Sequence, residues 1–338
     1  MANILKEYFP LIRERNEVIE DINSKEELCI EFHNWTKNQQ EEFLDFCTGV
    51  RGMRILTDSV IKEVLSPEFV PERLSDFLSL AFGQKVKILK VLPNDSIRLA
   101  TEGTLLITDV VVELEDGTIV NVEIQRIGYK FPGERAACYS ADLLLRQYKR
   151  IRDSSGKKFT YKSIKPVYTI VIFEKSPKEF HEFPDEYLHY VEAKANTGLE
   201  MNLLQKYIFI PLDIFRKTRH NIDNKMDAWL TFFSTDDPEE IVKLIITYPE
   251  FKPMYEDVYQ LCLNTEKVMG MFSKELQILD ENTVQYMIDE MQDTINEMRE
   301  TMDEQQGTID EQKGTINELE KRIEQLQKQL KDVGVQPE

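Results

Sequence analysis

Residues 105–125 show the pattern of two short β-strands joined by the turn sequence Glu115-Asp116-Gly117. An Asp-Gly pair between two apolar runs is a strong signal for a β-hairpin. Asp109 lies inside the first run, directly before three valines. A carboxylate in such a position is costly unless a cation or a hydrogen-bond donor compensates for it. The chain must therefore build a sheet in which this acid has a partner.

The length of the turn decides where that acid points. A two-residue turn would pair Asp109 with Ile124 and place the acid on the opposite side of the sheet from Glu123. A three-residue turn, with Gly117 left-handed in a bulge, pairs Asp109 with Glu123 instead, and directly opposed residues share a face. Only the three-residue turn keeps polar and apolar residues on separate faces, so we predict this register.

In the predicted register one face of the hairpin is apolar and the other is polar. The apolar face is formed by Leu106, Val110, Val112, Leu114, Val120, Val122 and Ile124. The polar face is formed by Asp109, Asn121, Glu123 and Gln125. Two neighbouring carboxylates repel each other unless a hard divalent cation lies between them. Mg²⁺ binds one or two carboxylates, retains water and takes phosphate oxygens as further ligands, so the polar face predicts a metal site that acts on phosphate esters.

The rest of the chain alternates between helical and β-rich segments. We expect helices within 1–50, 58–82, 133–152 and 223–279, and further strands at 86–92, 96–100, 166–173 and 206–211. Helix, several strands, helix and strand in this order predict an α/β fold with a mixed central sheet flanked by helices.

Charge is distributed unevenly along the 338 residues. The net charge of −19 argues against a general polyanion-binding protein, but acidic residues are concentrated at the two ends. Residues 126–179 carry thirteen basic and five acidic side chains. This locally basic stretch keeps nucleic acid as a candidate partner, because Lys and Arg bind the phosphate backbone by releasing counterions.

The last sixty residues repeat a seven-residue pattern. Apolar or amide side chains recur at alternating steps of three and four, at Ile288, Met291, Ile295, Met298, Met302, Gln305, Ile309, Gln312, Ile316, Leu319, Ile323, Leu326 and Leu330, which we call the seam. A seam with Ile mostly at one core position and Leu or Met at the other favours a parallel two-stranded coiled coil. A solvated single helix and an intramolecular hairpin remain the alternatives, and we expect a homodimer.

Compartment and cofactor class follow from what the sequence lacks. The four cysteines are widely spaced, the four histidines show no metal-ligand spacing, and no apolar run approaches the ~18 residues of a membrane helix. The amino terminus shows no secretory signal. We therefore expect a cytoplasmic protein with reduced thiols and no membrane partner.

The spacing of the polar residues resembles a known family. Asp109, thirteen intervening residues and then Glu123-Ile124-Gln125 resemble the PD-(D/E)XK nuclease core, in the E-x-Q variant of nuclease-family transposases and recombination-promoting nucleases. The sequences at 58–65, 134–148 and 165–173 are similar to the family's opening helix, its later helix with Arg135, Tyr139 and Gln147, and its following strand. The resemblance covers roughly residues 52–270.

The resemblance implies a restriction-endonuclease-like core and a role for each residue of the motif. Asp109, Glu123 and the backbone carbonyl of Ile124 would bind Mg²⁺ or Mn²⁺, and Gln125 would orient the attacking water. Thr108 stands where the parent motif has proline, which matters little. Gln125 replaces a lysine, and an amide carries no charge to stabilise hydroxide, so catalysis could be slow.

Other residues have weaker assignments. Glu63 is a candidate extra acid; Arg135 and Tyr139 could contact phosphate or brace Glu123, and a structural helix–sheet contact is the alternative for both. A basic track (Arg146, Lys149, Arg150, Arg152, Lys157 and Lys158) is a candidate DNA-backbone surface, with solvated charge at a helix end as the alternative.

The sequence thus predicts four segments and two possible functions. The segments are an acidic helical segment at 1–51, a nuclease core at 52–215, a helical tail packed on the core at 216–280 and a coiled coil at 281–332. The first function is a metal-dependent DNA endonuclease linked to recombination or mobile elements. The second is a catalytically degenerate nuclease fold that binds DNA or protein and is assembled by its coiled coil.

Overall fold

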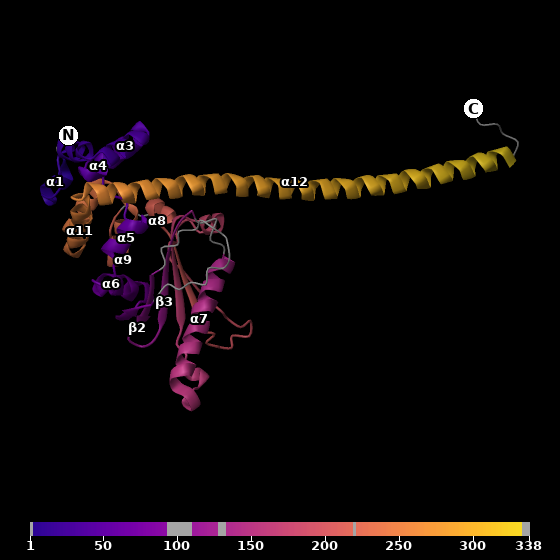
Figure 1. Cartoon of the computed structure of the whole chain (residues 1–338). Coiled ribbons are helices and arrows are strands. Elements are labelled where there is room, and N and C mark those ends of the chain that lie inside the picture. The colour runs from indigo at the N-terminus through magenta and orange to yellow at the C-terminus, as the bar shows by residue number, and fades with distance from the viewer. Residues whose placement is uncertain (1–2, 93–109, 128–132, 219–220, 333–338) are drawn as a thin grey trace. The chain divides into compact units, whose positions relative to one another are not determined.

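The computed structural model describes residues 3–92, 110–127, 133–218 and 221–332 (Figure 1). The chain divides into two compact units, Met1–Ile278 and Leu279–Glu338. Each unit is described by itself. Among the described helices, none combines the length and the apolar character that a membrane crossing requires.

A six-stranded mixed sheet forms the centre of the first unit, in the order β1-β2-β3-β4-β6-β5. The strands are β1 (Ile88–Val91), β2 (Val110–Leu114), β3 (Ile119–Ile127), β4 (Val167–Lys175), β5 (His189–Glu192) and β6 (Gln205–Pro211). The first three form an antiparallel meander, and β3, β4 and β6 run parallel. The predicted mixed sheet is confirmed. The predicted strand at 96–100 and the 105–109 portion of the hairpin lie outside the described residues.

The edge strand β5 was not predicted from the sequence. It is only four residues long, and its side chains are mostly exposed. Its strand conformation depends on antiparallel pairing with β6, from His189 opposite Phe209 to Glu192 opposite Lys206. Because the segment has no apolar alternation of its own, only that pairing reveals it as a strand.

Helices cover both faces of the sheet. The described α-helices are α1 (Ile4–Tyr8), α2 (Arg15–Ser24), α3 (Glu26–Asn34), α4 (Lys37–Cys47), α5 (Asp58–Val64), α6 (Pro71–Phe82), α7 (Gly133–Ser155), α8 (Leu212–Thr218), α9 (Lys225–Ser234), α10 (Pro238–Thr247), α11 (Lys252–Cys262) and α12 (Thr265–Asp332). Figure 1 shows α7 on one face and α5, α6 and α9 on the other. The helix α7 is the crossover between the parallel strands β3 and β4.

The helix ends follow local sequence rules. The side chain of Thr36 accepts from the backbone of Gln39, and the Gln39 side chain accepts from the backbone of Thr36, which is a capping box before α4. Asp237 caps α10 through its side chain. The two prolines within 58–82 separate α5 from α6, and Pro71 is the first residue of α6, where its missing N–H costs nothing.

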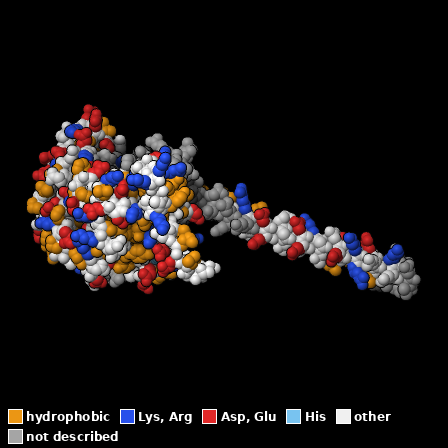
Figure 2. Space-filling view, turned by 90° about the horizontal axis from the view of Figure 1, so that it is seen from below, with side chains coloured by type: hydrophobic (Ala, Val, Ile, Leu, Met, Phe, Trp, Pro, Cys, Tyr) orange, Lys and Arg blue, Asp and Glu red, His pale blue; other side chains and the backbone are white. Residues whose placement is uncertain are grey.

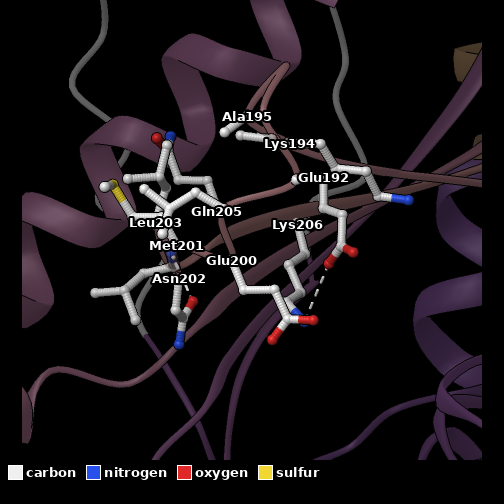
Figure 3. Close-up of a pocket in the computed structure, with 13 residues that line it drawn as sticks. Glu192, Lys194, Ala195, Glu200, Met201, Asn202, Leu203, Gln205 and Lys206 are labelled. Carbon is white, nitrogen blue, oxygen red and sulfur yellow. Dashed lines mark hydrogen bonds and ion pairs between the residues drawn. The ribbon is translucent and has the colours of Figure 1, made fainter.

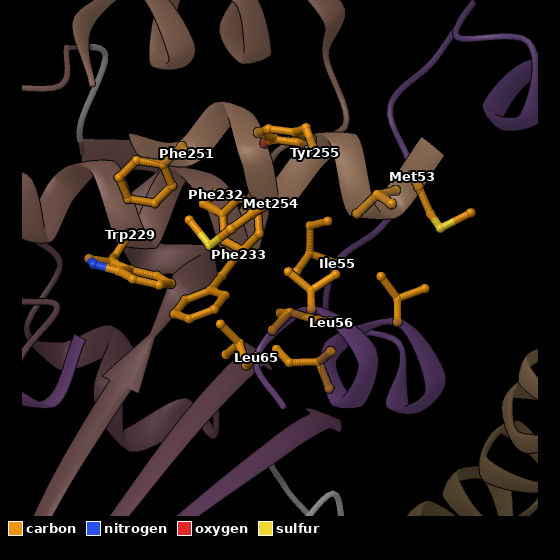
Figure 4. Close-up of a cluster of buried hydrophobic side chains, with 14 of the residues drawn as sticks. Met53, Ile55, Leu56, Leu65, Trp229, Phe232, Phe233, Phe251, Met254 and Tyr255 are labelled. Atoms are coloured by element: carbon orange, nitrogen blue, oxygen red, sulfur yellow. The ribbon is translucent and has the colours of Figure 1, made fainter. Parts of the chain in front are cut away.

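The largest hydrophobic cluster lies on the α5–α6–α9 side of the sheet and is rich in aromatic rings (Figure 4). Phe232 contacts Trp229, Phe251 and Tyr255 at ring-centroid distances of 5.9, 5.6 and 5.2 Å. Phe9 of the amino-terminal helices lies 5.0 Å from Tyr259 in the same cluster. The acidic amino-terminal helices therefore share one core with the helical tail, and the finer segment boundaries within the first unit stay a prediction.

In the second unit the described residues from 279 to 332 are helical and belong to α12. The described apolar side chains of the seam are exposed in the single chain, with relative exposures between 42% for Ile295 and 67% for Met302. A helix that leaves a stripe of large apolar side chains in water lacks the burial that normally stabilises it. The exposed seam is compatible with the predicted coiled coil and supplies the face that a second helix would cover.

Candidate active site

The β2–β3 hairpin has the predicted three-residue turn. Gly117 has a φ of +87°, and the Leu114 amide donates to the Thr118 carbonyl oxygen over 2.9 Å. The Asp116 side chain accepts from the Thr118 amide at 2.9 Å and so stabilises the turn. Val110 pairs with Val122, as the predicted register requires. The register is confirmed over the described residues.

The two faces of the hairpin also separate as predicted. Val112, Val120, Val122 and Ile124 belong to the large hydrophobic cluster on one side. Asn121, Glu123 and Gln125 point to the other side, which is the polar face. Their relative exposures are 2%, 0% and 5%. Since successive side chains of a strand alternate between faces, the confirmed turn fixes this arrangement.

The buried carboxylate of Glu123 has a neighbour on its own strand. The Asn121 side-chain amide donates to Glu123 Oε1 over 2.8 Å. Asn121 was predicted on this face but without a role, and the structure shows that it orients the carboxylate. A hydrogen bond from a neutral amide stabilises the carboxylate without removing its charge.

The other predicted carboxylate, Asp109, lies outside the described residues, as does Leu106. Its pairing with Glu123 stays a prediction. Among the described residues there is no group of three or more His, Cys, Asp or Glu side chains that could hold a metal ion. Glu123 and the Ile124 carbonyl are the described parts of the predicted ligand set.

The backbone around Ile124 can be oriented from its neighbours. The Thr118 carbonyl accepts from Leu114 of β2, whereas the Ile119 amide donates to Pro166 on the β4 side. Because the N–H and C=O of one strand residue point the same way and alternate along the strand, even-numbered residues of β3 face β2. The Ile124 carbonyl is therefore directed toward the β2 side, where the sequence places Asp109.

The helix α7 covers the polar face and contributes further polar groups. Ser140 of α7 and Thr169 of β4 are fully buried, and Thr169 pairs directly with Asn121. Four buried atoms on this side, Asn121 Oδ1, Gln125 Nε2, Ser140 Oγ and Thr169 Oγ1, have no hydrogen-bond partner within the described part of the chain. Buried polar groups in native proteins are nearly always satisfied by protein, water or an ion. The three oxygen atoms of this cluster can accept from water, including water bound to a metal, whereas Gln125 Nε2 can only donate.

Arg135 and Tyr139 lie in the first turns of α7, near the same face. The Arg135 guanidinium donates to the Tyr139 hydroxyl at 2.8 and 3.0 Å, and the Tyr139 ring packs against the cluster of Ala136, Val171 and Phe173. Phe173 is the β4 partner of Gln125. The structure thus places the side chains of Arg135 and Tyr139 next to the strand positions that carry the motif. Their contact to phosphate stays a prediction.

Gln147, further along α7, has a structural contact. Its side-chain oxygen accepts from the Lys165 amide at 2.7 Å, and its amide donates to the Gly117 carbonyl at 3.4 Å. The residue ties the hairpin turn to the start of β4. It therefore fixes the hairpin against the parallel strands at the end of the sheet opposite to Gln125.

The basic track is partly engaged in ion pairs. Arg146 pairs with Asp142 at 2.8 Å, and Arg150 pairs with Glu113 at 2.9 Å. Lys149, Lys157 and Lys158 are exposed. The track extends from the carboxyl-terminal half of α7 into the following short helix Gly156–Lys158.

Glu63 is not brought to the polar face. It forms an ion pair with Lys267 of α12 over 2.6 Å. Its neighbours Val60, Ile61 and Val64 in α5 pack into the large cluster that holds Val122 and Ile124. That cluster lies on the reverse face of β3 from Glu123, and the accessory role of Glu63 stays a prediction without a contact to support it.

A hollow of about 500 Å³ lies elsewhere, within the loop that joins β5 to β6 (Figure 3). Figure 3 shows Glu192 and Lys206 facing each other, and they form an ion pair at 3.4 Å. Two strands, β4 and β6, separate β3 from β5 in the sheet order. The hollow is therefore distinct from the polar face and lacks its buried amide and carboxylate groups.

The family comparison agrees with this geometry. A family model described as PD-(D/E)XK nuclease family transposase matches residues 55–292. The match covers more than half of the chain, and the chain belongs to this family. Its mixed sheet flanked by helices is the restriction-endonuclease-like α/β fold. A search of curated proteins and a search of solved structures gave no match.

Membership in this family indicates a nuclease linked to mobile elements, and such nucleases act on DNA and generally use divalent metals. The matched region contains the hairpin, α7 and all of the parallel strands. It ends inside α12, after the first positions of the seam. The seam beyond residue 292 is an addition to the part that defines the family.

Proposed function

We propose that the chain is a divalent-metal-dependent DNA endonuclease that hydrolyses phosphodiester bonds during recombination or the movement of mobile elements. The observation that carries the proposal is the wholly buried Glu123 carboxylate, flanked on its own strand by Asn121 and Gln125. A buried carboxylate among unsatisfied polar atoms is stabilised when a cation shares the site. We place this activity in the cytoplasm, where the four free cysteines stay reduced.

Asp109, Glu123 and the Ile124 carbonyl would hold the metal, because all three supply the oxygen ligands that Mg²⁺ and Mn²⁺ prefer. When bound, the metal supplies charge stabilisation at the phosphate and lowers the pKa of a coordinated water. Asn121 keeps the Glu123 carboxylate in one orientation through its 2.8 Å hydrogen bond. The chain thereby contributes a preorganised ligand instead of a mobile one.

Gln125 follows on the same face and would orient the attacking water through its amide oxygen. Since an amide does not ionise, it cannot accept the proton of that water as a base. Arg135, held by Tyr139, would lie near the phosphate and balance its charge. The basic track would hold the DNA backbone at the far end of α7.

We also propose that two chains associate through the seam as a parallel coiled-coil homodimer. The support is the set of exposed apolar side chains at heptad spacing between Met291 and Leu326. Pairing two chains would place two nuclease cores on one DNA substrate. A dimer of this kind suits an enzyme that cuts two strands or two sites.

A second candidate function is a degenerate nuclease fold that binds DNA or protein without cutting it. The neutral Gln125 and the net charge of −19 support this candidate. The two candidates differ in metal binding, which can be measured. A degenerate core would not depend on Mg²⁺ or Mn²⁺ for stability or activity.

Plasmid cleavage tests the first candidate. Purified protein should nick or linearise a supercoiled plasmid with Mg²⁺ or Mn²⁺ and should be inactive in EDTA. Asp109→Ala and Glu123→Gln should abolish cleavage. Glu115→Gln removes an exposed carboxylate from the turn of the same hairpin and should cut like the wild type. Unchanged cleavage by Asp109→Ala would refute the assignment.

Thermal unfolding with added metal separates the two candidates. A ligand that binds only the folded state at 100 times its dissociation constant stabilises it by about 2.7 kcal/mol. The wild type should therefore melt at a higher temperature in Mn²⁺ or Mg²⁺, and Glu123→Gln should lose the shift. A wild type without a metal-dependent shift and without cleavage would favour the degenerate binding module.

A further inference from the structure

Three aromatic rings lie together at the carboxyl-terminal end of α7, and we call Tyr148, Phe159 and Tyr161 the aromatic platform. The rings of Tyr148 and Tyr161 are nearly parallel, with an interplanar angle of 7° and centroids 6.1 Å apart. Phe159 meets them edge-on at 5.5 and 5.3 Å. Tyr161 is 73% exposed, so burial in the core does not account for its position.

One cation contacts the aromatic platform, and several others are close to it in the sequence. Arg152 donates to the Tyr148 hydroxyl at 2.5 Å, and its guanidinium carbon lies 5.7 Å from the centre of that ring. Lys149, Lys157, Lys158 and Lys162 are exposed nearby in the sequence. Between 144 and 165 the chain carries eight Lys or Arg residues and one acidic residue, Asp153. In a chain with a net charge of −19, this local excess marks a surface for an anion.

Figure 2 views the first unit from the end at which α7 terminates in Figure 1, and Lys and Arg side chains lie at several places on that face among Asp and Glu side chains. The platform residue Tyr161 stands between Lys158 and Lys162 in the chain and begins the short helix Tyr161–Ser163. Rings and cations therefore alternate along one short stretch of surface.

We propose that the aromatic platform stacks unpaired bases of DNA, so that the substrate contains a single-stranded segment next to the duplex. The faces of bases are hidden inside a duplex, and an exposed ring gains from stacking only where the bases are unpaired. Grooves that bind single strands combine stacking rings with Lys and Arg along the phosphates, which is the combination found at the platform. The inference rests on the proposed DNA-binding role of the basic track and names the form of DNA that the track would hold.

Tyr139 and Tyr148 are nine residues apart on α7, which is about 14 Å along the axis at 1.5 Å per residue and half a turn around it. The platform therefore lies on a different side of the helix from Tyr139. The inference accordingly concerns the form of DNA that the chain binds and does not depend on the position of cleavage.

Metal-free binding measurements test the inference without relying on catalysis. The full-length protein is titrated in EDTA against a fluorescent 20-nucleotide oligothymidylate and against a 20-base-pair duplex. Stacking is worth about 1–3 kcal/mol per base, so Tyr161→Ala should bind the single strand about 5- to 140-fold more weakly. Its duplex affinity should change less than twofold, and Tyr161→Phe should bind both forms like the wild type.

Matched variants control for exposure and charge. Phe69→Ala removes another highly exposed ring, from the loop before α6, and should leave both affinities unchanged. The double variant Lys157→Gln with Lys158→Gln should weaken both forms of DNA, because phosphate contacts do not distinguish them. Since Tyr161 is largely exposed, its variants should melt at the wild-type temperature.

Two results would overturn the inference: single-strand affinity unchanged in Tyr161→Ala, or an equal loss for both forms of DNA. Absence of single-strand binding by the wild type would do the same. The nuclease proposal fails on different evidence. If no substrate is cut with Mg²⁺ or Mn²⁺ but Tyr161→Ala loses single-strand binding selectively, the platform stands and the endonuclease assignment falls.

Discussion

The polar face of β3 and the seam of α12 reverse the usual distribution of side chains in opposite ways. In the first unit, Glu123 is a fully buried carboxylate. In the second unit, Ile309 and Ile316 are large apolar side chains that stand in water. Each departure is unfavourable in an isolated chain, since buried charge and exposed apolar surface both cost free energy. The comparison locates the two departures, and our proposals place a cation at the first and a second helix at the second.

The largest effect on stability is expected in the core of the first unit. Phe232→Ala removes a fully buried ring and should reduce the free energy of unfolding by about 3–5 kcal/mol. Met302→Ala truncates an exposed seam residue and should change the unfolding of the first unit by less than about 0.5 kcal/mol. Denaturant titration followed by tryptophan fluorescence, with both tryptophans in the first unit, measures each change. A loss of several kcal/mol in Met302→Ala would show that the seam contributes to the stability of the first unit.

The second-largest effect is expected on the association of two chains through the seam. Ile309→Asp combined with Ile316→Asp puts charge into the seam and should weaken the dimer by about 3 kcal/mol or more, or at least 100-fold, since each buried Ile is worth about 1.5–3 kcal/mol. Gly307→Asp with Gly314→Asp adds the same charges to the outer face predicted for the coiled coil and should leave the dimer intact. Sedimentation equilibrium distinguishes the two. A wild type that is monomeric at micromolar concentration would remove the homodimer from the proposal.

Replacing a glycine by alanine should change stability in opposite directions in the two units. Gly117→Ala places a side chain at a φ of +87°, with its Cβ 3.2 Å from Lys165 Cγ, and should cost about 1–2 kcal/mol. Gly307→Ala lies in α12 with open space around it and should raise helix stability by up to about 1 kcal/mol. Circular dichroism during thermal unfolding reports both. A harmless Gly117→Ala would contradict the bulged turn, and with it the basis for the faces of β3.

The smallest effect at neutral pH comes from two buried tyrosines. Burial raises the pKa of Tyr255 and of Tyr259 above the ordinary value. Their contribution to stability is present below about pH 10, where the unfolded side chains are protonated too, and is lost as the pH rises through the raised values. The double variant Tyr255→Phe with Tyr259→Phe should therefore lose less stability than the wild type between pH 9 and pH 11.

At pH 7 the same double variant should unfold within about 0.5 kcal/mol of the wild type. Neither hydroxyl has a hydrogen-bond partner within the described residues, so its removal breaks no bond. Melting temperatures across the pH series test both statements. If the melting temperature of the double variant falls with rising pH as steeply as that of the wild type, other groups cause the loss of stability at alkaline pH.

Local patterns in the sequence predicted much of the fold and of the site. The Asp-Gly turn and the separation of apolar from polar residues predicted the β2–β3 register, and that register alone places Asn121, Glu123 and Gln125 on one face. Helix α7 and strands β4 and β6 were predicted from their periodicity, and their observed bounds differ by at most three residues. Thr169 could have been added to the site by the same alternation along β4.

Contacts between distant segments could not be predicted in this way. The ion pair of Glu63 with Lys267 joins residues more than two hundred positions apart, and no local pattern connects them. The pairing of Arg150 with Glu113 and the edge strand β5 are of the same kind. The aromatic platform was also missed, because its three rings lie in separate turns of the chain and converge only when the segment after α7 folds back.

The sequence by itself determined the alternation of faces in the hairpin, the helical periods and the heptad seam, because each depends on neighbours within a few residues and on the fixed geometry of strand and helix. Tertiary structure alone decided that α7 covers the polar face, that Glu123 is fully buried and that the amino-terminal helices enter the main core. Burial is a property of what packs on a surface, and the packing partners here come from segments far apart in the chain. The chemistry of Glu123 was therefore encoded locally, while its environment was set by the whole first unit.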